Sequence, residues 1–95
     1  KSVGNKYFAI YFKGNDLNKP RIAISISKKV GNAVVRNHQK RIIREILRPL
    51  LLSISSKDLL IIIKKKSTDL SVNEKERNIK HLIEKMIKIG EKNDN

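Results

Sequence analysis

Several residue types are missing or scarce in this chain of 95 residues. It has no cysteine, which excludes disulfides and thiolate metal sites and leads us to expect a reducing compartment, the cytoplasm. It also has no tryptophan and only two tyrosines. Acidic residues number 9 against 22 Lys and Arg, a net charge of +13. This imbalance predicts an anionic partner, either a nucleic acid or a membrane surface.

Long hydrophobic runs and catalytic arrangements are lacking as well. No apolar run approaches the roughly 20 residues that cross a bilayer, and we see no signal peptide. No Cys or carboxylate cluster stands near His38 or His81 at ligand spacing, so we expect no metal site in the chain. There is no Ser-His-Asp set, no carboxylate pair at useful spacing and no glycine loop for phosphate. Nothing therefore suggests that the chain performs chemistry alone.

Three segments have the patterns of β-strands. Residues 7–13 and 21–27 alternate, so that each segment has one apolar face and one milder face. Gly14 and Asn15 follow the first segment and tolerate turn conformations, so we expect these two strands to form a hairpin. Residues 59–63 are continuously apolar, which predicts a central strand buried on both faces.

The first predicted helix is amphipathic. It begins after Asn32, a suitable N-cap, and ends near Arg48, because Pro49 disfavours helical geometry before it. At 100° per residue, one arc is apolar and consists of Val35, Ile42, Ile43, Ile46 and Leu47. We assign Asn37 and five basic residues to the opposite arc: Arg36, Lys40, Arg41, Arg44 and Arg48.

A second helix follows the last strand. Ser71 and Glu74 form a capping box, and Gly90 is a suitable residue just past the end of the helix. Residues 91–95 are polar, and we expect a flexible tail. The predicted order is β-β-α-β-α, which gives an α+β fold in a single small domain over residues 1–95, with the helices packed on the sheet.

Positive charge is concentrated in residues 28–48. This segment has seven Lys or Arg and one acid, Glu45, so it carries +6 of the total +13. A solvated helix face normally mixes charges of both signs, whereas arginine-rich faces suit phosphate contact. Membrane-surface binding is an alternative use, but packing on the sheet would occupy the apolar arc. The triple lysine at residues 64–66 is more simply explained as general electrostatics.

Tyr7 and Tyr11 share the milder face of their predicted strand with Ala9. They are either ordinary half-buried strand residues or a stacking platform for single-stranded bases, which can stack on any aromatic face. Ser25, on the neighbouring predicted strand, is small, like Ala9, and would leave room for a base or a backbone.

The segment from Ser25 to Glu45 resembles the protein subunit of bacterial ribonuclease P across its RNR motif. The matching pattern reads Ser25-x-Ser27-Lys28-Lys29-Val30-Gly31-Asn32-Ala33-Val34-Val35-Arg36-Asn37-x-x-Lys40-Arg41-x-x-Arg44-Glu45. Further similarity covers most of the chain and lies at Ser2-Val3-x-Asn5, at Asp58 with the apolar strand, at Leu70-Ser71-x-x-Glu74 and at His81-Leu82.

The resemblance implies an RNA-binding subunit of a tRNA-processing endonuclease. The catalytic RNA, with Mg²⁺, would remove the 5′ leader of precursor tRNA, and the protein would bind that RNA and the leader. The positions implied for the catalytic RNA are Lys28, Lys29, Asn32, Arg36, Asn37, Lys40, Arg41 and Arg44. Those implied for the leader, in a cleft on the sheet, are Tyr7, Ala9, Tyr11, Arg21 and Ser25. The expected partners are ribonuclease P RNA and precursor tRNA, with no membrane and no obligatory protein partner.

The family also implies a left-handed βαβ crossover through the basic helix, in a ribosomal protein S5 domain 2-like fold, whereas general chirality rules predict a right-handed one. Two features depart from the family. His38 stands where a third basic residue is usual, and no counterpart of the family's N-terminal basic helix precedes Lys1. We therefore expect a cleft open on one side and weakened leader binding. The alternatives are a structural RNA-binding protein such as a ribosomal component, whose binding would ignore the leader, and, less favoured, a membrane-surface protein or a self-sufficient nuclease.

Overall fold

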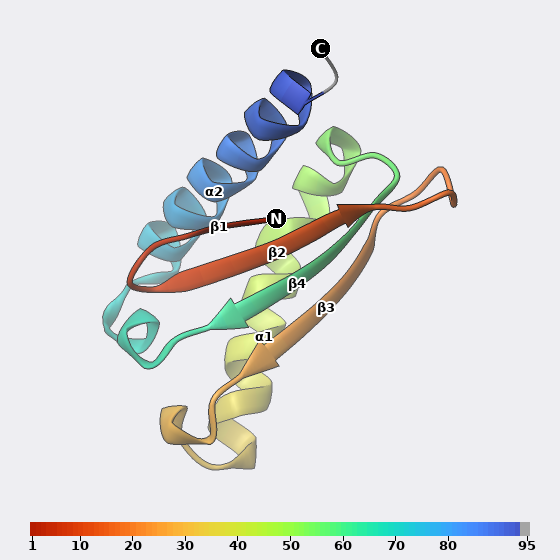
Figure 1. The fold of residues 1–95 in the computed structure, drawn as a ribbon. Coiled ribbons are helices and arrows are strands. Elements are labelled where there is room, and N and C mark those ends of the chain that lie inside the picture. Colours follow the sequence, from red (N-terminus) through yellow and green to blue (C-terminus); the bar gives the residue numbers. More distant parts are fainter. Residues whose placement is uncertain (94–95) are drawn as a thin grey trace.

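A four-stranded sheet and two long helices form two layers in the computed structural model, which describes residues 1–93 (Figure 1). The strands are β1 (Ser2–Gly4), β2 (Phe8–Gly14), β3 (Arg21–Ile26) and β4 (Lys57–Ile63). The long helices are α1 (Ala33–Leu47) and α2 (Val72–Asn93), and three 3₁₀ helices are η1 (Lys28–Val30), η2 (Arg48–Ser53) and η3 (Lys65–Asp69). Both long helices lie behind the sheet in Figure 1, so the opposite face of the sheet is open.

The strand order is β1-β2-β4-β3, and the expected hairpin between β2 and β3 is wrong. β4 lies between these strands, antiparallel to β2 and parallel to β3. The connection between β2 and β3 spans the width of β4, and Asn15 anchors it by donating from Nδ2 to the carbonyl of Lys19 (3.2 Å) and to Oδ1 of Asp58 (2.9 Å). The most apolar strand thus takes the centre, where both of its edges are paired. The short strand β1 is an addition to the predicted order.

The crossover from β3 through α1 to β4 is left-handed, as the family resemblance implies. In Figure 1, β3 and β4 both run downward, β4 lies to the left of β3, and α1 passes behind them. A right-handed connection would place the helix on the other face of the sheet. This arrangement puts α1 beside α2 and leaves the front of the sheet open.

The core lies between the helices and one face of the sheet. Leu59, Ile61 and Ile63 of β4 are buried there, together with Phe8 and Ile10 of β2. The prediction that β4 is buried on both faces is wrong, because the helices cover one face alone and Leu60 on the other face is 38% exposed. The open face therefore presents apolar side chains outside the core.

The predicted start of α1 is confirmed, since Oδ1 of Asn32 accepts a hydrogen bond from the backbone N–H of Val35 at 3.0 Å. The helix ends at Leu47, and η2 continues the chain with Pro49 near its start. Val35, expected on the apolar arc, is 38% exposed. The first turns of α1 extend past the end of β3 in Figure 1, so the sheet does not cover them.

The capping box of α2 is confirmed by two reciprocal hydrogen bonds between Ser71 and Glu74. The backbone N–H of Ser71 donates to Oε1 of Glu74 (3.0 Å), and the backbone N–H of Glu74 donates to Oγ of Ser71 (3.2 Å). The predicted end at Gly90 is wrong, because α2 continues to Asn93. Residues 91–93 of the expected tail are thus helical, and residues 94–95 lie outside the described part of the chain.

Candidate nucleic-acid interface

The chain reverses between β3 and α1 in a short capped segment that presents two lysines. Oγ of Ser27 caps η1 by accepting from the backbone N–H of Lys29 at 3.1 Å, and both lysines of η1 are exposed. Gly31 allows the close turn into α1, because a Cβ atom there would lie 3.0 Å from Cβ of Val35. The backbone and Asn32 together therefore fix where the basic helix begins.

An exposed ridge along α1 consists of Asn37, Arg41 and Arg44 and continues to Arg48 at the start of η2. Its three arginines make it basic. Arg48 is partly neutralised, because its Nη2 lies 3.0 Å from Oε1 of Glu45. Within residues 1–93, Arg41 and Arg44 form no ion pair. Two guanidinium groups on the outer surface are thus available to an external anion, and arginine suits phosphate particularly well.

Arg36 and Lys40 do not lie on the opposite arc as expected but are half-buried. Seven residues make nearly two helical turns, so Arg36 points almost the same way as the buried Ile43. The Nε atom of Arg36 is buried and has no hydrogen-bond partner in the described chain. Its side chain therefore lies close to the protein, and any contact with an external anion uses its outer nitrogens.

Lys75 is a buried lysine that the sequence argument missed. Its side chain is 4% exposed, and Nζ donates to Oε1 of Gln39 on α1 at 3.0 Å. Burial lowers the pKa of this ammonium, because desolvation disfavours its charge. The signal was present, since Lys75 lies four residues before the buried Ile79 and so shares the apolar stripe of α2.

His38 is exposed and lines a groove of about 380 Å³ between α1 and the start of α2. Arg41 borders the same groove, and Glu76 contributes a carboxylate from α2. The residue that departs from the family pattern is therefore not on the ridge formed by Arg44 but on the flank of α1 that faces α2.

The open face of the sheet brings together three of the residues predicted to bind the leader. Cross-strand pairing sets Tyr11 beside Leu60 and Ala9 beside Ile62, and Ile62 in turn pairs with Ser25. Tyr11 is 50% exposed, so part of its ring is available for stacking. Leu60 and Ile62 add an apolar floor that the sequence argument had assigned to the core.

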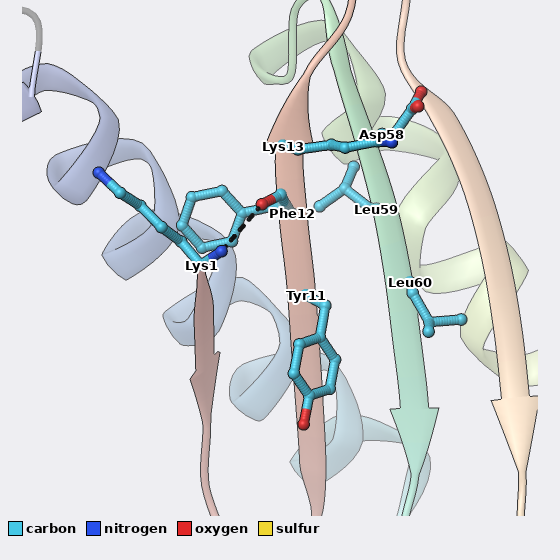
Figure 2. Close-up of a pocket in the computed structure, with 7 residues that line it drawn as sticks. All are labelled: Lys1, Tyr11, Phe12, Lys13, Asp58, Leu59 and Leu60. Carbon is cyan, nitrogen blue, oxygen red and sulfur yellow. Dashed lines mark hydrogen bonds between the residues drawn. The ribbon is translucent and has the colours of Figure 1, made fainter.

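A hollow of about 320 Å³ lies beside Tyr11 on this face (Figure 2). Its lining residues are Lys1, Tyr11, Phe12, Lys13, Asp58, Leu59 and Leu60. The lining combines two aromatic residues, two leucines, two lysines and the carboxylate of Asp58. This combination suits a stacked base with a neighbouring phosphate.

Arg21 lies at one end of the open face and is held by Asp58. Its Nε donates to Oδ1 at 2.8 Å and its Nη2 to Oδ2 at 2.7 Å. Hydrogen bonds from Arg21 and Asn15, with the nearby charges of Arg21 and Lys13, hold the pKa of the Asp58 carboxyl far below its usual value. Figure 2 shows Lys13 extending across the sheet toward Asp58. The register places Lys13, Asp58 and Arg21 in one row.

Tyr7 is less available than Tyr11. It precedes β2, is half-buried against the core, and has the Nζ atom of Lys6 at 5.2 Å from its ring centroid. Lys64, from the lysine run, donates from Nζ to the carbonyl of Asn5 at 2.7 Å, so it braces this end of the sheet. The structure thus separates Tyr7 from the exposed group around Tyr11, and its contact with a leader stays a prediction.

No cluster of three or more His, Asp or Glu side chains within residues 1–93 is suited to hold a metal ion. In the same part of the chain, neither long helix has the combination of length and apolarity that spanning a bilayer requires. Two surfaces of the described chain suit a nucleic acid: the basic helix, on the back of the domain, and the open sheet, on the front.

Comparison with known proteins identifies the family. The sequence model of the family described as Ribonuclease P matches residues 1–87. The chain is 43% identical to the ribonuclease P protein component of Streptococcus gordonii over 89 residues, covering 94% of this chain and 74% of that protein. It is 39% identical to that of Staphylococcus epidermidis over 84 residues, covering 87% and 73%.

Solved structures agree with the sequence comparison. The ribonuclease P protein of Staphylococcus aureus superposes with a TM-score of 0.80 at 34% identity, covering 88% of this chain and 78% of that one. The protein of Thermotoga maritima gives a TM-score of 0.80 at 30% identity, covering 86% and 79%. The α+β fold expected from the sequence is confirmed by these likenesses.

Proposed function

Because the chain belongs to the ribonuclease P protein family and is thus a subunit of that tRNA-processing endoribonuclease, we propose that its two opposite faces bind two different RNAs. The basic side, built from η1 and α1, binds ribonuclease P RNA. The open sheet face binds the single-stranded 5′ leader of precursor tRNA. One protein can then hold both RNAs at once, because the sheet and helix layers separate the two surfaces (Figure 1).

The observation that carries the first assignment is the unpaired charge on α1. Arg41 and Arg44 are exposed and have no acidic partner within residues 1–93, so both are free to contact phosphates. Lys28 and Lys29 extend the positive surface beyond the start of the helix, and the half-buried Arg36 borders it. Such contacts supply affinity and orientation without reading sequence.

The second assignment depends on the surroundings of Tyr11. Its exposed ring, the small residues Ala9 and Ser25, and the apolar Leu60 form a surface on which unpaired bases can stack. A duplex offers its bases mainly at their edges, whereas a leader exposes their faces. This face therefore favours a single strand, and the cytoplasm, where precursor tRNA occurs, is the proposed site of action.

We propose that Mg²⁺ for the reaction is held mainly by the catalytic RNA. The donor set of the open face does not suit a cation, because both oxygens of the Asp58 carboxylate already accept hydrogen bonds from Arg21. Lys13 adds a positive charge beside them. The protein's contribution is then positional and electrostatic, which is effective for phosphate chemistry when reacting groups are held in place.

Reconstitution tests this function. The protein is mixed with a bacterial ribonuclease P RNA and a 5′-labelled precursor tRNA at low Mg²⁺, with each component also tested alone. We expect cleavage at the mature 5′ end from the complete mixture and none from the protein alone. Cleavage by the protein alone, or no stimulation of the RNA by a folded protein, would contradict the proposal.

A further inference from the structure

We propose that Asp58 is a positioning residue, which holds Arg21 in a fixed orientation at the end of the leader-binding face. This inference depends on the proposed function of the open sheet. Asp58 itself is poorly placed to contact RNA, because its side chain is 21% exposed while that of Arg21 is 60% exposed. The carboxylate is therefore the more covered partner of the pair, and the guanidinium group is the more exposed one.

The geometry fixes the plane of the guanidinium group. Nε and Nη2 of Arg21 each donate to a different carboxylate oxygen, at 2.8 and 2.7 Å, which is the bidentate arrangement. Asn15 holds the carboxylate in turn, donating from Nδ2 to Oδ1 at 2.9 Å. Nη1 of Arg21 donates no hydrogen bond within the described chain, and the planar geometry of the pair turns its two N–H groups away from the carboxylate.

A fixed guanidinium helps binding because an exposed arginine otherwise loses rotamer freedom when it meets a ligand. Arg21 belongs to β3 and Asp58 to β4, and the two are direct cross-strand partners. The sheet therefore sets their distance before any RNA arrives. Nη1 is then ready to donate to a phosphate or to a base edge of a strand that crosses the face.

A purely electrostatic role of Asp58 and a positioning role predict opposite changes in leader binding when its negative charge is removed. A carboxylate on a polyanion-binding face repels phosphate, so Asp58→Asn should tighten leader binding if charge alone mattered. If Asp58 orients Arg21, the same substitution weakens leader binding although it raises the net charge. The sign of the change therefore distinguishes the two explanations.

The test uses the full chain assembled with ribonuclease P RNA. The affinity for a precursor tRNA is divided by the affinity for the same tRNA without its leader, and this ratio is the leader gain. We expect Asp58→Asn to lower the leader gain about fivefold, since charge-assisted hydrogen bonds are strong. The matched control is Asp16→Asn, which removes the same charge from an exposed residue that makes no ion pair within residues 1–93, and it should not lower the gain.

Arg21→Lys keeps the inference testable if Asp58→Asn folds poorly. Lysine keeps the charge but cannot form the bidentate pair, so this substitution at an exposed side chain should also lower the leader gain. In the double variant of Arg21→Ala with Asp58→Asn, the loss should equal that of Arg21→Ala alone, because the two residues act together.

Two outcomes have different meanings. If Asp58→Asn leaves the leader gain unchanged or raises it, or if Arg21→Lys retains the full gain, the positioning role is wrong and the proposed function still stands. If the unmodified protein shows no leader gain, the proposed function of the open face fails first.

Discussion

Removing one exposed arginine from α1 should change how binding to the catalytic RNA depends on salt. Arg44 lies on the basic ridge, is exposed and has no ion-pair partner within residues 1–93. If the proposed function is right, Arg44→Ala removes a contact with RNA phosphate and leaves the buried packing of α1 intact. The free energy of unfolding should change little, and the effect should appear in the RNA affinity.

The magnitude follows from counterion release. Each phosphate contact contributes about 0.7 to 0.9 to the slope of log affinity against log salt, so about five contacts give a slope near −4. Raising the salt from about 50 to about 200 mM then weakens the unmodified protein about 250-fold. Arg44→Ala should have a slope near −3.2 and lose about 80-fold over the same interval.

The assay is direct titration of ribonuclease P RNA with protein at four or more salt concentrations. The control is Lys88→Ala, which removes one exposed charge from α2 and should leave the slope near that of the unmodified protein. Equal slopes for Arg44→Ala and the unmodified protein, or equal reductions in both variants, would refute the assignment of the ridge on α1.

Three further predictions concern the open face, the core and the response to acid. Tyr11→Ala should weaken binding of a precursor tRNA about tenfold and leave the binding of mature tRNA almost unaffected, because one stacked base is lost. Competition binding measures both affinities, and equal losses of affinity for the two tRNAs would exclude stacking. Ile61→Ala, at a fully buried position, should lower the free energy of unfolding, measured by urea denaturation, by about 2–5 kcal/mol. Leu60→Ala, at a partly exposed position, should lower it by much less, and equal losses would contradict the one-sided core. In the folded chain, the pKa values of the Asp58 and Glu74 carboxyls lie below their unfolded values. Their stabilising effect is therefore present above about pH 4 and is lost as the pH falls further. Asp58→Asn should reduce this loss of stability in acid, and an unchanged pH profile of unfolding would contradict the role of Asp58.

Local signals in the sequence predicted the elements that depend on local interactions. Asn32 and the Ser71–Glu74 pair act within one helical turn, so their identity alone marked where α1 and α2 begin. The alternation of residues 7–13 likewise placed Phe8 in the core and Tyr11 outside it. These assignments required no knowledge of which segments meet in space.

The errors arose where the answer depends on distant partners. The position of β4 between β2 and β3 depends on pairing between residues that are distant in sequence. The adjacency of residues 7–13 and 21–27 in the sequence therefore wrongly suggested a hairpin. Leu60 was assigned to the core because an apolar run does not reveal that both helices lie on one side. The left-handed crossover came from the family resemblance, since general chirality rules favour the other hand.

The candidate site was predictable in part. The sequence placed Tyr11, Ala9 and Ser25 on one face, and the strand register brings them together. The ion pair of Arg21 with Asp58 was missed, because these residues lie on strands whose pairing was not foreseen. The prediction that Arg36 lies opposite the apolar arc was wrong, because at 100° per residue this position points nearly the same way as the buried Ile43.

The most direct test of the account is to ask which RNA lies against each face. A photo-crosslinking amino acid is placed at position 44 or at position 11 of the full chain, and each variant is assembled with ribonuclease P RNA and a precursor tRNA. The account predicts that position 44 crosslinks to the catalytic RNA and position 11 to the 5′ leader. Crosslinks from both positions to the same RNA, or with the two RNAs exchanged, would contradict the division of the two faces.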